Sequence, residues 1–276
     1  MKINIRIIVF SIIIIICIFA LNFGVYWQFF RKTENTPTNP NNPTANINYE
    51  QLAKDFKDIF SNTLDYQGHE VNISGITKLK ANEDLIYTWV NKEASIENKY
   101  DLTLNIPRVN ISSVSAEKFN ENIKNIYVNK ANDIILHSTS HTIYTVEYMS
   151  YINTNILSLV IKSTLKEGNN PQRVIIQTYN YNLSTNEEVT FNQMLEIKGL
   201  HENEIKASVL KVAQNANVEA GELKNLGYNV FIRDLSSNIY EPSNISNFIL
   251  GKDNYLYVIY PYGNSNFTDA MDVVVF

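Results

Sequence analysis

The feature that most constrains this chain is an uncharged apolar run near its N-terminus. Residues 7–30 read IIVFSIIIIICIFALNFGVYWQFF, and only three of them are clearly polar. As a helix rising about 1.5 Å per residue, this run spans roughly 36 Å and can cross a hydrocarbon core of about 30 Å. Tyr26 and Trp27 fall at its far end, where aromatic rings favour the membrane–water interface. The run predicts a transmembrane helix in contact with membrane lipid.

This helix is expected to be a permanent anchor rather than a cleaved signal. A secretory signal peptide has an apolar region of about 7–15 residues followed by a cleavage site of small residues. Here the run is longer, and its last residues, VYWQFF, offer no such site. Lys2, Arg6 and the N-terminal amine outnumber Arg31 and Lys32, which favours a cytoplasmic N-terminus. We expect a single-pass protein of the cell membrane, with a cytoplasmic tail over 1–6, a helix over 7–30 and an extracytoplasmic C-terminal domain.

Residues 31–48 form the predicted spacer between this helix and a folded domain. The segment 33–48 reads TENTPTNPNNPTANIN, with three prolines, many polar residues and no apolar periodicity. Such a composition cannot bury enough surface to offset the entropy lost on ordering. The segment is therefore expected to be a flexible and fairly extended linker.

Charge is distributed unevenly along the chain. The formal net charge is −5, yet the first 32 residues hold four basic residues and no acidic residue. Residues 33–276 therefore carry 19 basic against 28 acidic residues, a net charge of −9. This sign argues against binding to nucleic acid, and it favours a cationic protein of the cell envelope as a partner at low ionic strength.

Hydrophobic periodicity beyond the spacer predicts an α+β domain with an antiparallel sheet and a few packed helices. Apolar residues at helical spacing predict helices over 49–64 with Asn48 as N-cap, from the N-cap Ser115 to about 134, and over 201–215. Alternating or continuous apolar runs predict strands over 85–90, 100–106 (closed by Pro107), 142–151, 157–165, 173–183, 247–250, 256–260 and 271–276, and those between 142 and 183 are expected to form a meander. We divide this domain into an N-terminal part, 49–166, and a C-terminal part, 167–276.

Catalytic and metal-binding motifs are missing from the sequence. The single cysteine, Cys17, lies in the apolar run, so a disulfide framework and a cysteine-based zinc site are excluded. His137 and His141 are four residues apart, but they sit where a helix gives way to a strand, and no H-E-x-x-H pattern is present. We therefore expect no enzyme activity, no cofactor, and no catalytic or metal-ligating residue.

Tyrosine is the one residue type whose abundance suggests a binding surface. The chain has 17 tyrosines, many of them in predicted strands. Tyrosine suits a half-buried pleated surface, which explains most of them, but aromatic rings also anchor interfaces. Tyr260 and Tyr262 bracket Pro261, where the strand is expected to leave the sheet and expose their rings. These two residues are the candidate binding residues.

The order of several motifs resembles that of surface proteins from Firmicutes. These motifs are Ile106-Pro107, Phe119-Asn120, Asn155-Ile-Leu-Ser158, the stretch TYNYNLSTNEEVTFNQML over 178–195, and LYVIYPY over 256–262. Together they resemble the extracytoplasmic region of lysozyme-sensing anti-sigma factors and the non-catalytic region of a peptidoglycan deacetylase. Two features depart from that pattern. The turn at 167–172 lacks a histidine, and a cytoplasmic tail of six residues cannot form a sigma-binding domain.

The resemblance implies an extracytoplasmic domain that binds or senses a component of the bacterial cell envelope. Its ligand would be a lysozyme-like protein or peptidoglycan. The alternative is an enzyme, or an accessory domain of one, that acts on cell-wall polysaccharide. Two carboxyl groups facing each other across a cleft would favour the enzyme, and an aromatic binding surface would favour the binding protein.

Overall fold

The computed structural model describes residues 47–67 and 73–276. The predicted transmembrane helix over 7–30 and almost all of the predicted spacer lie outside the described residues. Within the described ranges, no helix is both long enough and apolar enough to cross a membrane. Asn48–Phe276 forms one compact unit. The predicted boundary between the N-terminal and C-terminal parts, at 166/167, lies at the end of the strand Ile156–Glu167. This strand pairs with the next one, Arg173–Asn182, so the two parts share one sheet.

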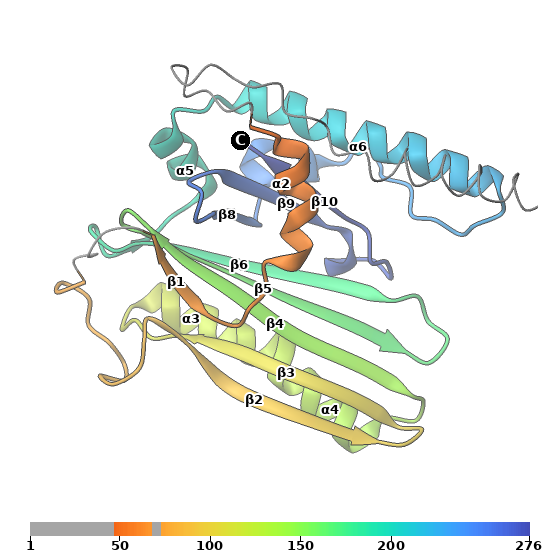
Figure 1. The fold of residues 1–276 in the computed structure, drawn as a ribbon, viewed down its shortest axis with the longest axis horizontal. Coiled ribbons are helices and arrows are strands. Elements are labelled where there is room, and N and C mark those ends of the chain that lie inside the picture. Colours follow the sequence, from red (N-terminus) through yellow and green to blue (C-terminus); the bar gives the residue numbers. More distant parts are fainter. Residues whose placement is uncertain (1–46, 68–72) are drawn as a thin grey trace, which may run out of the picture. The chain divides into compact units, whose positions relative to one another are not determined.

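A seven-stranded mixed sheet forms the centre of the unit (Figure 1). Its strands are β1 (Leu64–Gln67), β2 (Ile86–Ile96), β3 (Tyr100–Val109), β4 (Thr142–Asn153), β5 (Ile156–Glu167), β6 (Arg173–Asn182) and β7 (Glu187–Glu188). They lie in the order β2-β3-β4-β5-β6-β7, and β1 also pairs with β4. The predicted meander from β4 to β6 is confirmed, with antiparallel pairing at each step. The α+β class is confirmed for the described residues.

Parallel pairing on one side of β4 is the main departure from the antiparallel expectation. β3 pairs in parallel with Thr142–Val146, and β1 pairs in parallel with Ser150–Asn153. Between these two partners, the Asn62 side chain accepts a hydrogen bond from the backbone N–H of Tyr148 at 3.0 Å. A helical crossover joins β3 to β4, and such a connection brings two strands together in parallel.

Strand β3 does not end at Pro107 as expected but continues to Val109. The partner strand β2 shifts its register between Thr88 and Val90, and Thr88 is the residue paired with Pro107. A proline cannot donate a ladder hydrogen bond, so it is tolerated where a bulge interrupts the pairing. The irregularity in β2 thus lets the strand run past its proline.

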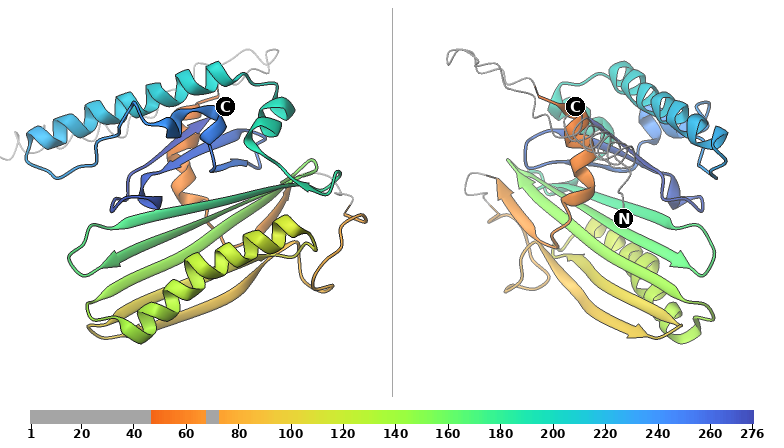
Figure 2. Two further views of the ribbon diagram at one scale, coloured as in Figure 1. Left: turned by 180° about the vertical axis from the view of Figure 1, so that it is seen from behind. Right: turned by 45° about the vertical axis from the view of Figure 1, so that its right-hand side comes forward.

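One helical segment covers one face of the large sheet (Figure 2). It consists of α3 (Val114–Ile123), a π-helical turn (Lys124–Val128) and α4 (Asn129–His137). Its N-cap is Ser113 rather than the expected Ser115, because the Ser113 hydroxyl accepts the N–H of Ala116 at 3.3 Å. Its apolar residues, with Tyr127 fully buried among them, pack against the inward residues of β3, β4 and β5.

A three-stranded sheet packs on the opposite face of the large sheet. Its strands are β8 (Phe248–Leu250), β9 (Leu256–Pro261) and β10 (Met271–Val275), in the order β10-β9-β8. Helix α2 (Tyr49–Asp55) packs beside β10 and is shorter than predicted: a 3-10 turn (Phe56–Asp58) follows it and β1 soon begins. The expected N-cap, Asn48, is confirmed, since its side chain accepts the N–H of Gln51 at 3.0 Å.

Two further helices cover the other face of this small sheet. They are α5 (Phe191–Lys198) and α6 (Glu202–Asn225), and their buried residues share a core with β8, β9 and β10. Helix α6 runs beyond the predicted end at 215. Hydrophobic periodicity did not predict its last turns, because they present few buried residues and show no apolar stripe. Three 3-10 turns complete this region: η3 (Asn238–Tyr240), η4 (Pro242–Asn244) and η5 (Tyr262–Asn264).

Candidate binding site

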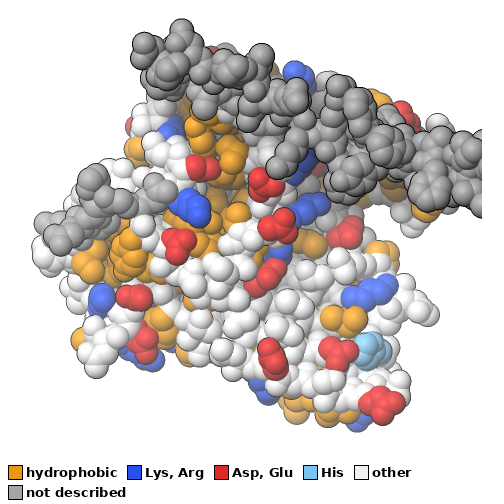
Figure 3. All heavy atoms as spheres, viewed as in Figure 1, with side chains coloured by type: hydrophobic (Ala, Val, Ile, Leu, Met, Phe, Trp, Pro, Cys, Tyr) orange, Lys and Arg blue, Asp and Glu red, His pale blue; other side chains and the backbone are white. Residues whose placement is uncertain are grey.

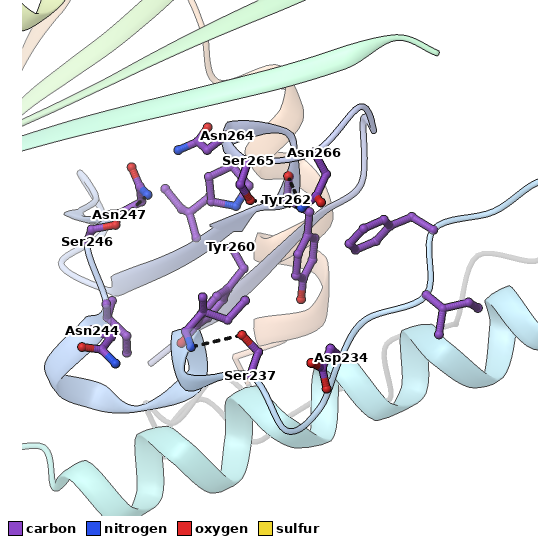
Figure 4. Close-up of a pocket in the computed structure, with 16 residues that line it drawn as sticks. Asp234, Ser237, Asn244, Ser246, Asn247, Tyr260, Tyr262, Asn264, Ser265 and Asn266 are labelled. Carbon is purple, nitrogen blue, oxygen red and sulfur yellow. Dashed lines mark hydrogen bonds between the residues drawn. The ribbon is translucent and has the colours of Figure 1, made fainter. Parts of the chain in front are cut away.

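A pocket of about 410 Å³ opens between the end of β9, the turn η5 and the loops around η3 and η4 (Figure 4). We call it the Tyr262 pocket. Half of its lining is apolar or aromatic: Phe231, Ile232, Ile239, Ile245, Ile259, Tyr260, Pro261 and Tyr262. The other half is polar: Asp234, Ser237, Asn244, Ser246, Asn247, Asn264, Ser265 and Asn266. Among the residues that the structure describes, Asp234 is the only carboxylate that lines it.

The two candidate tyrosines line this pocket, but the expectation that their rings are exposed is wrong. Tyr260 and Tyr262 are only 6% and 5% exposed. Tyr260 lies on β9 and Tyr262 is the first residue of η5, and both rings pack in the core that the small sheet shares with α5 and α6. Strand β9 does end at Pro261, as expected, but its end does not expose the rings. Pro261 lies opposite Met271 at a position where its nitrogen faces away from β10, so no ladder bond is lost.

A buried polar network supports the floor of the pocket. The Tyr240 hydroxyl lies 2.7 Å from that of Tyr262, which donates to a carboxylate oxygen of Asp272 at 2.8 Å. Arg233 binds the same carboxylate through Nε at 2.7 Å and Nη2 at 2.6 Å. The Arg233 backbone is held in turn by the side chain of Asn217, with both hydrogen bonds at 2.8 Å. The pocket floor is therefore fixed to α6 and to β10.

Burial and hydrogen bonding set the protonation of this network. Burial raises the pKa of Tyr262, and the nearby Asp272 carboxylate raises it further. Burial would lower the pKa of Arg233, but its hydrogen bonds and charge pairing with Asp272 outweigh that effect, and the pKa is raised. The tyrosine therefore stays neutral and the arginine stays charged at ordinary pH. A neutral, fully engaged hydroxyl is a poor general base.

Turn η5 forms one wall of the pocket and is fixed to the large sheet. The Asn264 side chain exchanges two hydrogen bonds with the backbone of Ile176 on β6, each at 2.9 Å. Arg173 donates to the carbonyl groups of Gly263 and Asn264. Residue 263 must be glycine, because a Cβ atom there would lie 1.9 Å from the carbonyl oxygen of Val174.

The single carboxylate of the lining is held by its own loop. Asp234 accepts hydrogen bonds from the backbone N–H of Ser236 at 2.9 Å and from its hydroxyl at 2.6 Å. These bonds lower the pKa of Asp234. An ionised carboxylate without a facing acid, histidine or cysteine suits hydrogen bonding to a ligand better than acid–base chemistry.

Neither of the two histidines noted in the sequence lines this pocket, and each contacts a different carboxylate. His137 Nδ1 is 3.0 Å from Asp133 on α4, and His141 Nε2 is 2.8 Å from Asp101 on β3. Across residues 47–67 and 73–276, no three histidine, cysteine, aspartate or glutamate side chains gather closely enough to hold a metal ion.

Sequence reasoning identified two lining tyrosines and missed the residues that support them. Arg233 lies in a loop without periodicity, and Tyr240 lies in a short 3-10 turn. Asp272 carried a usable signal, because a lone carboxylate inside the apolar strand Met271–Val275 must find a partner when buried. The identity of that partner could come only from the tertiary structure.

Comparisons with known proteins find solved structures of low similarity to this chain. No protein-family profile matches the chain, and no curated protein matches it. A DUF3298 family protein from Pseudomonas aeruginosa PAO1 is 8% identical, with a TM-score of 0.39, covering 70% of this chain and 88% of that one. A member of the same family from Bacteroides fragilis NCTC 9343 is 12% identical, with a TM-score of 0.32, covering 72% of this chain and 91% of its own. Structural neighbours of this chain are thus DUF3298 family proteins.

Proposed function

We propose that this protein is a non-catalytic binding or sensing protein of the bacterial cell envelope. In this proposal the helix over 7–30 anchors it in the cell membrane, and the domain from Asn48 onward faces the wall. The ligand is a glycan fragment of peptidoglycan, and it binds in the Tyr262 pocket. The motif resemblance to lysozyme-sensing anti-sigma factors and to a deacetylase's non-catalytic region supports the location and the general role.

The composition of the pocket lining is the observation that carries the choice of ligand. Aromatic and aliphatic residues make up half of the lining, and amide and hydroxyl side chains make up nearly all the rest. A sugar offers apolar C–H faces, which pack on aromatic rings, and hydroxyl and acetamido groups, which pair with amides. A volume of about 410 Å³ lies within the range of small-ligand pockets.

Phe231 provides the sharpest test of this ligand. Its ring packs against that of Tyr262, with centroids 4.9 Å apart, and it is only partly buried. We expect Phe231→Ala to weaken binding of a purified disaccharide–peptide fragment of peptidoglycan about tenfold, because an aromatic anchor contributes on the order of 1–2 kcal/mol. Calorimetry on the full-length chain in detergent measures this change.

Phe267→Ala is the matched control, because Phe267 is 63% exposed and lies outside the Tyr262 pocket. It should leave the affinity unchanged, and thermal unfolding should show both variants folded. Equal binding by the wild type and Phe231→Ala would refute the assignment of the pocket. Assaying the same samples for fragment cleavage tests the enzyme alternative: turnover that disappears in Asp234→Asn would replace the binding proposal with a hydrolase.

A further inference from the structure

The outer edge of the small sheet offers unpaired backbone groups. β10 is the terminal strand, and it pairs only with β9. Phe276 and Leu256 exchange two backbone hydrogen bonds, of 3.0 and 2.9 Å, so the hydrogen-bonded residues of this strand are the even-numbered ones. The N–H and C=O groups of Met271, Val273 and Val275 must then point away from β9. Within the described ranges, none of these groups has a backbone or side-chain partner.

At the opposite edge of the same sheet, the outward backbone groups of β8 have hydrogen-bond partners. On β8, the N–H of Phe248 donates to Thr178 Oγ1 at 3.2 Å, and its carbonyl accepts from Asn180 Nδ2 at 2.8 Å. The N–H of Leu250 donates to Ser158 Oγ at 3.0 Å. Side chains of the large sheet thus satisfy the outward groups of β8. Those of β10 receive no such partner from the described residues.

The open edge of β10 forms the base of a groove of about 460 Å³. Helix α2 and the 3-10 turn after it form one wall, with Glu50, Lys54 and Lys57, and α6 forms the other, with Val212, Asn215, Ala216 and Glu219. In the described part of the chain, neither lysine is within ion-pair distance of a carboxylate. The groove therefore combines a strand edge, one wall with two unpaired ammonium groups beside one carboxylate, and one wall on which small apolar side chains alternate with an amide and a carboxylate.

We propose that this groove binds an extended peptide, which adds to the small sheet as a fourth strand beside β10. A row of alternating donors and acceptors at a strand edge matches the backbone of another strand. Side chains of a strand alternate between its two faces. An acidic residue on the face toward α2 would meet Lys54 and Lys57, and a small apolar residue on the other face would meet Val212 and Ala216.

The two helical walls favour a single peptide over a second copy of this chain. A second β10 would bring its own α2 and α6, which flank the edge of the strand in the same way. Pairing two such edges would press these helices against each other. A lone extended segment has no flanking elements and can reach the base of the groove.

The test uses the synthetic peptide acetyl-Val-Glu-Val-Glu-Val-amide and the full-length chain in detergent. Binding should be measurable by calorimetry and should weaken when both glutamates are replaced by lysine. Two further peptides test backbone pairing: one is N-methylated on the valine amides and the other on the glutamate amides. In a strand added beside β10, only one of these two sets of N–H groups faces β10, so only one of the two peptides should lose hydrogen bonds to it. One methylated peptide should bind as the parent does, and the other should lose binding at least about tenfold. Equal binding of both methylated peptides would overturn the proposal.

Variants of Val273 test the same idea from the side of the protein. Val273→Pro removes an N–H that points into the groove, whereas Val273→Ala keeps that N–H and shortens the same side chain. We expect the proline variant to lose about tenfold in affinity and the alanine variant to lose less than about threefold. Equal losses would contradict strand addition. A wild-type dimer in analytical ultracentrifugation that Val273→Pro converts to a monomer would assign the edge to a second copy and overturn the peptide proposal.

Discussion

Asp272 is a charged residue that lies buried in an otherwise apolar strand. Its neighbours on β10 are apolar, and its side chain is 7% exposed, yet it is held by a bidentate contact with Arg233, whose side chain is 10% exposed. Burying two charges costs several kcal/mol per ion, and the pair recovers this only through close geometry and additional hydrogen bonds. The hydroxyl of Tyr262 supplies one such bond. The pair therefore ties the loop before η3 to β10 with a fixed orientation.

We expect Arg233→Met to reduce the free energy of unfolding by about 3–5 kcal/mol, because it leaves the Asp272 carboxylate buried without its partner. Lys206→Met is the control, since the Lys206–Glu241 pair is 41% and 47% exposed and an exposed pair contributes about 0–1 kcal/mol. Urea denaturation measures both. If the two losses were equal, the buried pair would not have the stabilising role described here. The double variant Arg233→Met/Asp272→Leu should lose less than the sum of its single variants.

Two glycines in the same molecule should respond oppositely to alanine. Gly263→Ala should destabilise the fold by about 1–3 kcal/mol or more, because the new Cβ atom would meet the backbone of Val174 on β6. Gly221→Ala should stabilise it by about 0.5–1 kcal/mol, since the glycine lies within α6 and nothing occupies the space around its Cβ position. Thermal unfolding of both variants checks the signs. A stable Gly263→Ala protein would mean that η5 is not held against β6 as described.

At the scale of elements, short local signals mark helix ends that hydrophobic periodicity misses. Thr190 begins α5 with a capping box: its hydroxyl accepts the N–H of Gln193 at 3.4 Å, and the Gln193 side chain accepts the N–H of Thr190 at 2.8 Å. Gly199 ends this helix in the left-handed conformation, at φ 63°. Helix α6 continues past the end that periodicity predicted, and it stops just before Gly227, which is left-handed at φ 90°. The N–H of Tyr228 donates to the carbonyl of Leu223 at 3.1 Å, as at other helix ends closed by a glycine.

Thr190→Ala should cost about 1 kcal/mol of unfolding free energy, because it removes one half of the capping box. Thr190→Ser keeps the hydroxyl and should cost only a few tenths of a kcal/mol. Chemical denaturation followed by circular dichroism gives both values. The role of this cap would be contradicted by a loss in the serine variant as large as that in the alanine variant.

At the scale of the whole molecule, the tyrosines act collectively. Most of those in the strands lie inside the three cores. Burial raises the pKa most clearly for Tyr127, Tyr144, Tyr151, Tyr179, Tyr257, Tyr260 and Tyr262. The aromatic richness of this sequence therefore mainly serves the packing of a two-sheet fold. Two of these residues, Tyr260 and Tyr262, also line the Tyr262 pocket.

This distribution predicts alkaline sensitivity. The folded state holds these tyrosines protonated above the ordinary pKa of 10.0, while the unfolded chain loses the protons there. The contribution of these tyrosines to stability should therefore be constant below about pH 10 and fall as pH rises beyond it. Urea denaturation at several pH values measures the fall, and tyrosinate absorbance should rise later in the native chain than in denaturant. Coincident absorbance curves would contradict the burial of these hydroxyls.

The acidic balance of residues 33–276 predicts how a cationic partner would bind. Acidic and basic side chains are interspersed over the face shown in Figure 3, so on this face the expected attraction comes from the net charge rather than from one patch. Binding of lysozyme to the full-length chain should weaken at least about tenfold between low and physiological salt, where screening acts over about 8–10 Å. An uncharged protein of similar size is the control. Salt-independent binding would argue against the charge-based partner assignment.

The sequence by itself determined the local features of this protein: the α+β class, the β4–β6 meander, the Asn48 cap, the strands of the C-terminal sheet and the excess of acidic residues. These follow from periodicity, turn residues and composition, which act over a few neighbouring residues. Only the tertiary structure decided that β3 and β4 run parallel, that Tyr260 and Tyr262 are buried, that Arg233 pairs with Asp272 across 39 residues and that β10 has β9 as its single strand partner among the described residues. Each of these depends on which distant segments lie side by side. A strand pattern shows which residues share a face, but it does not identify the element that covers that face.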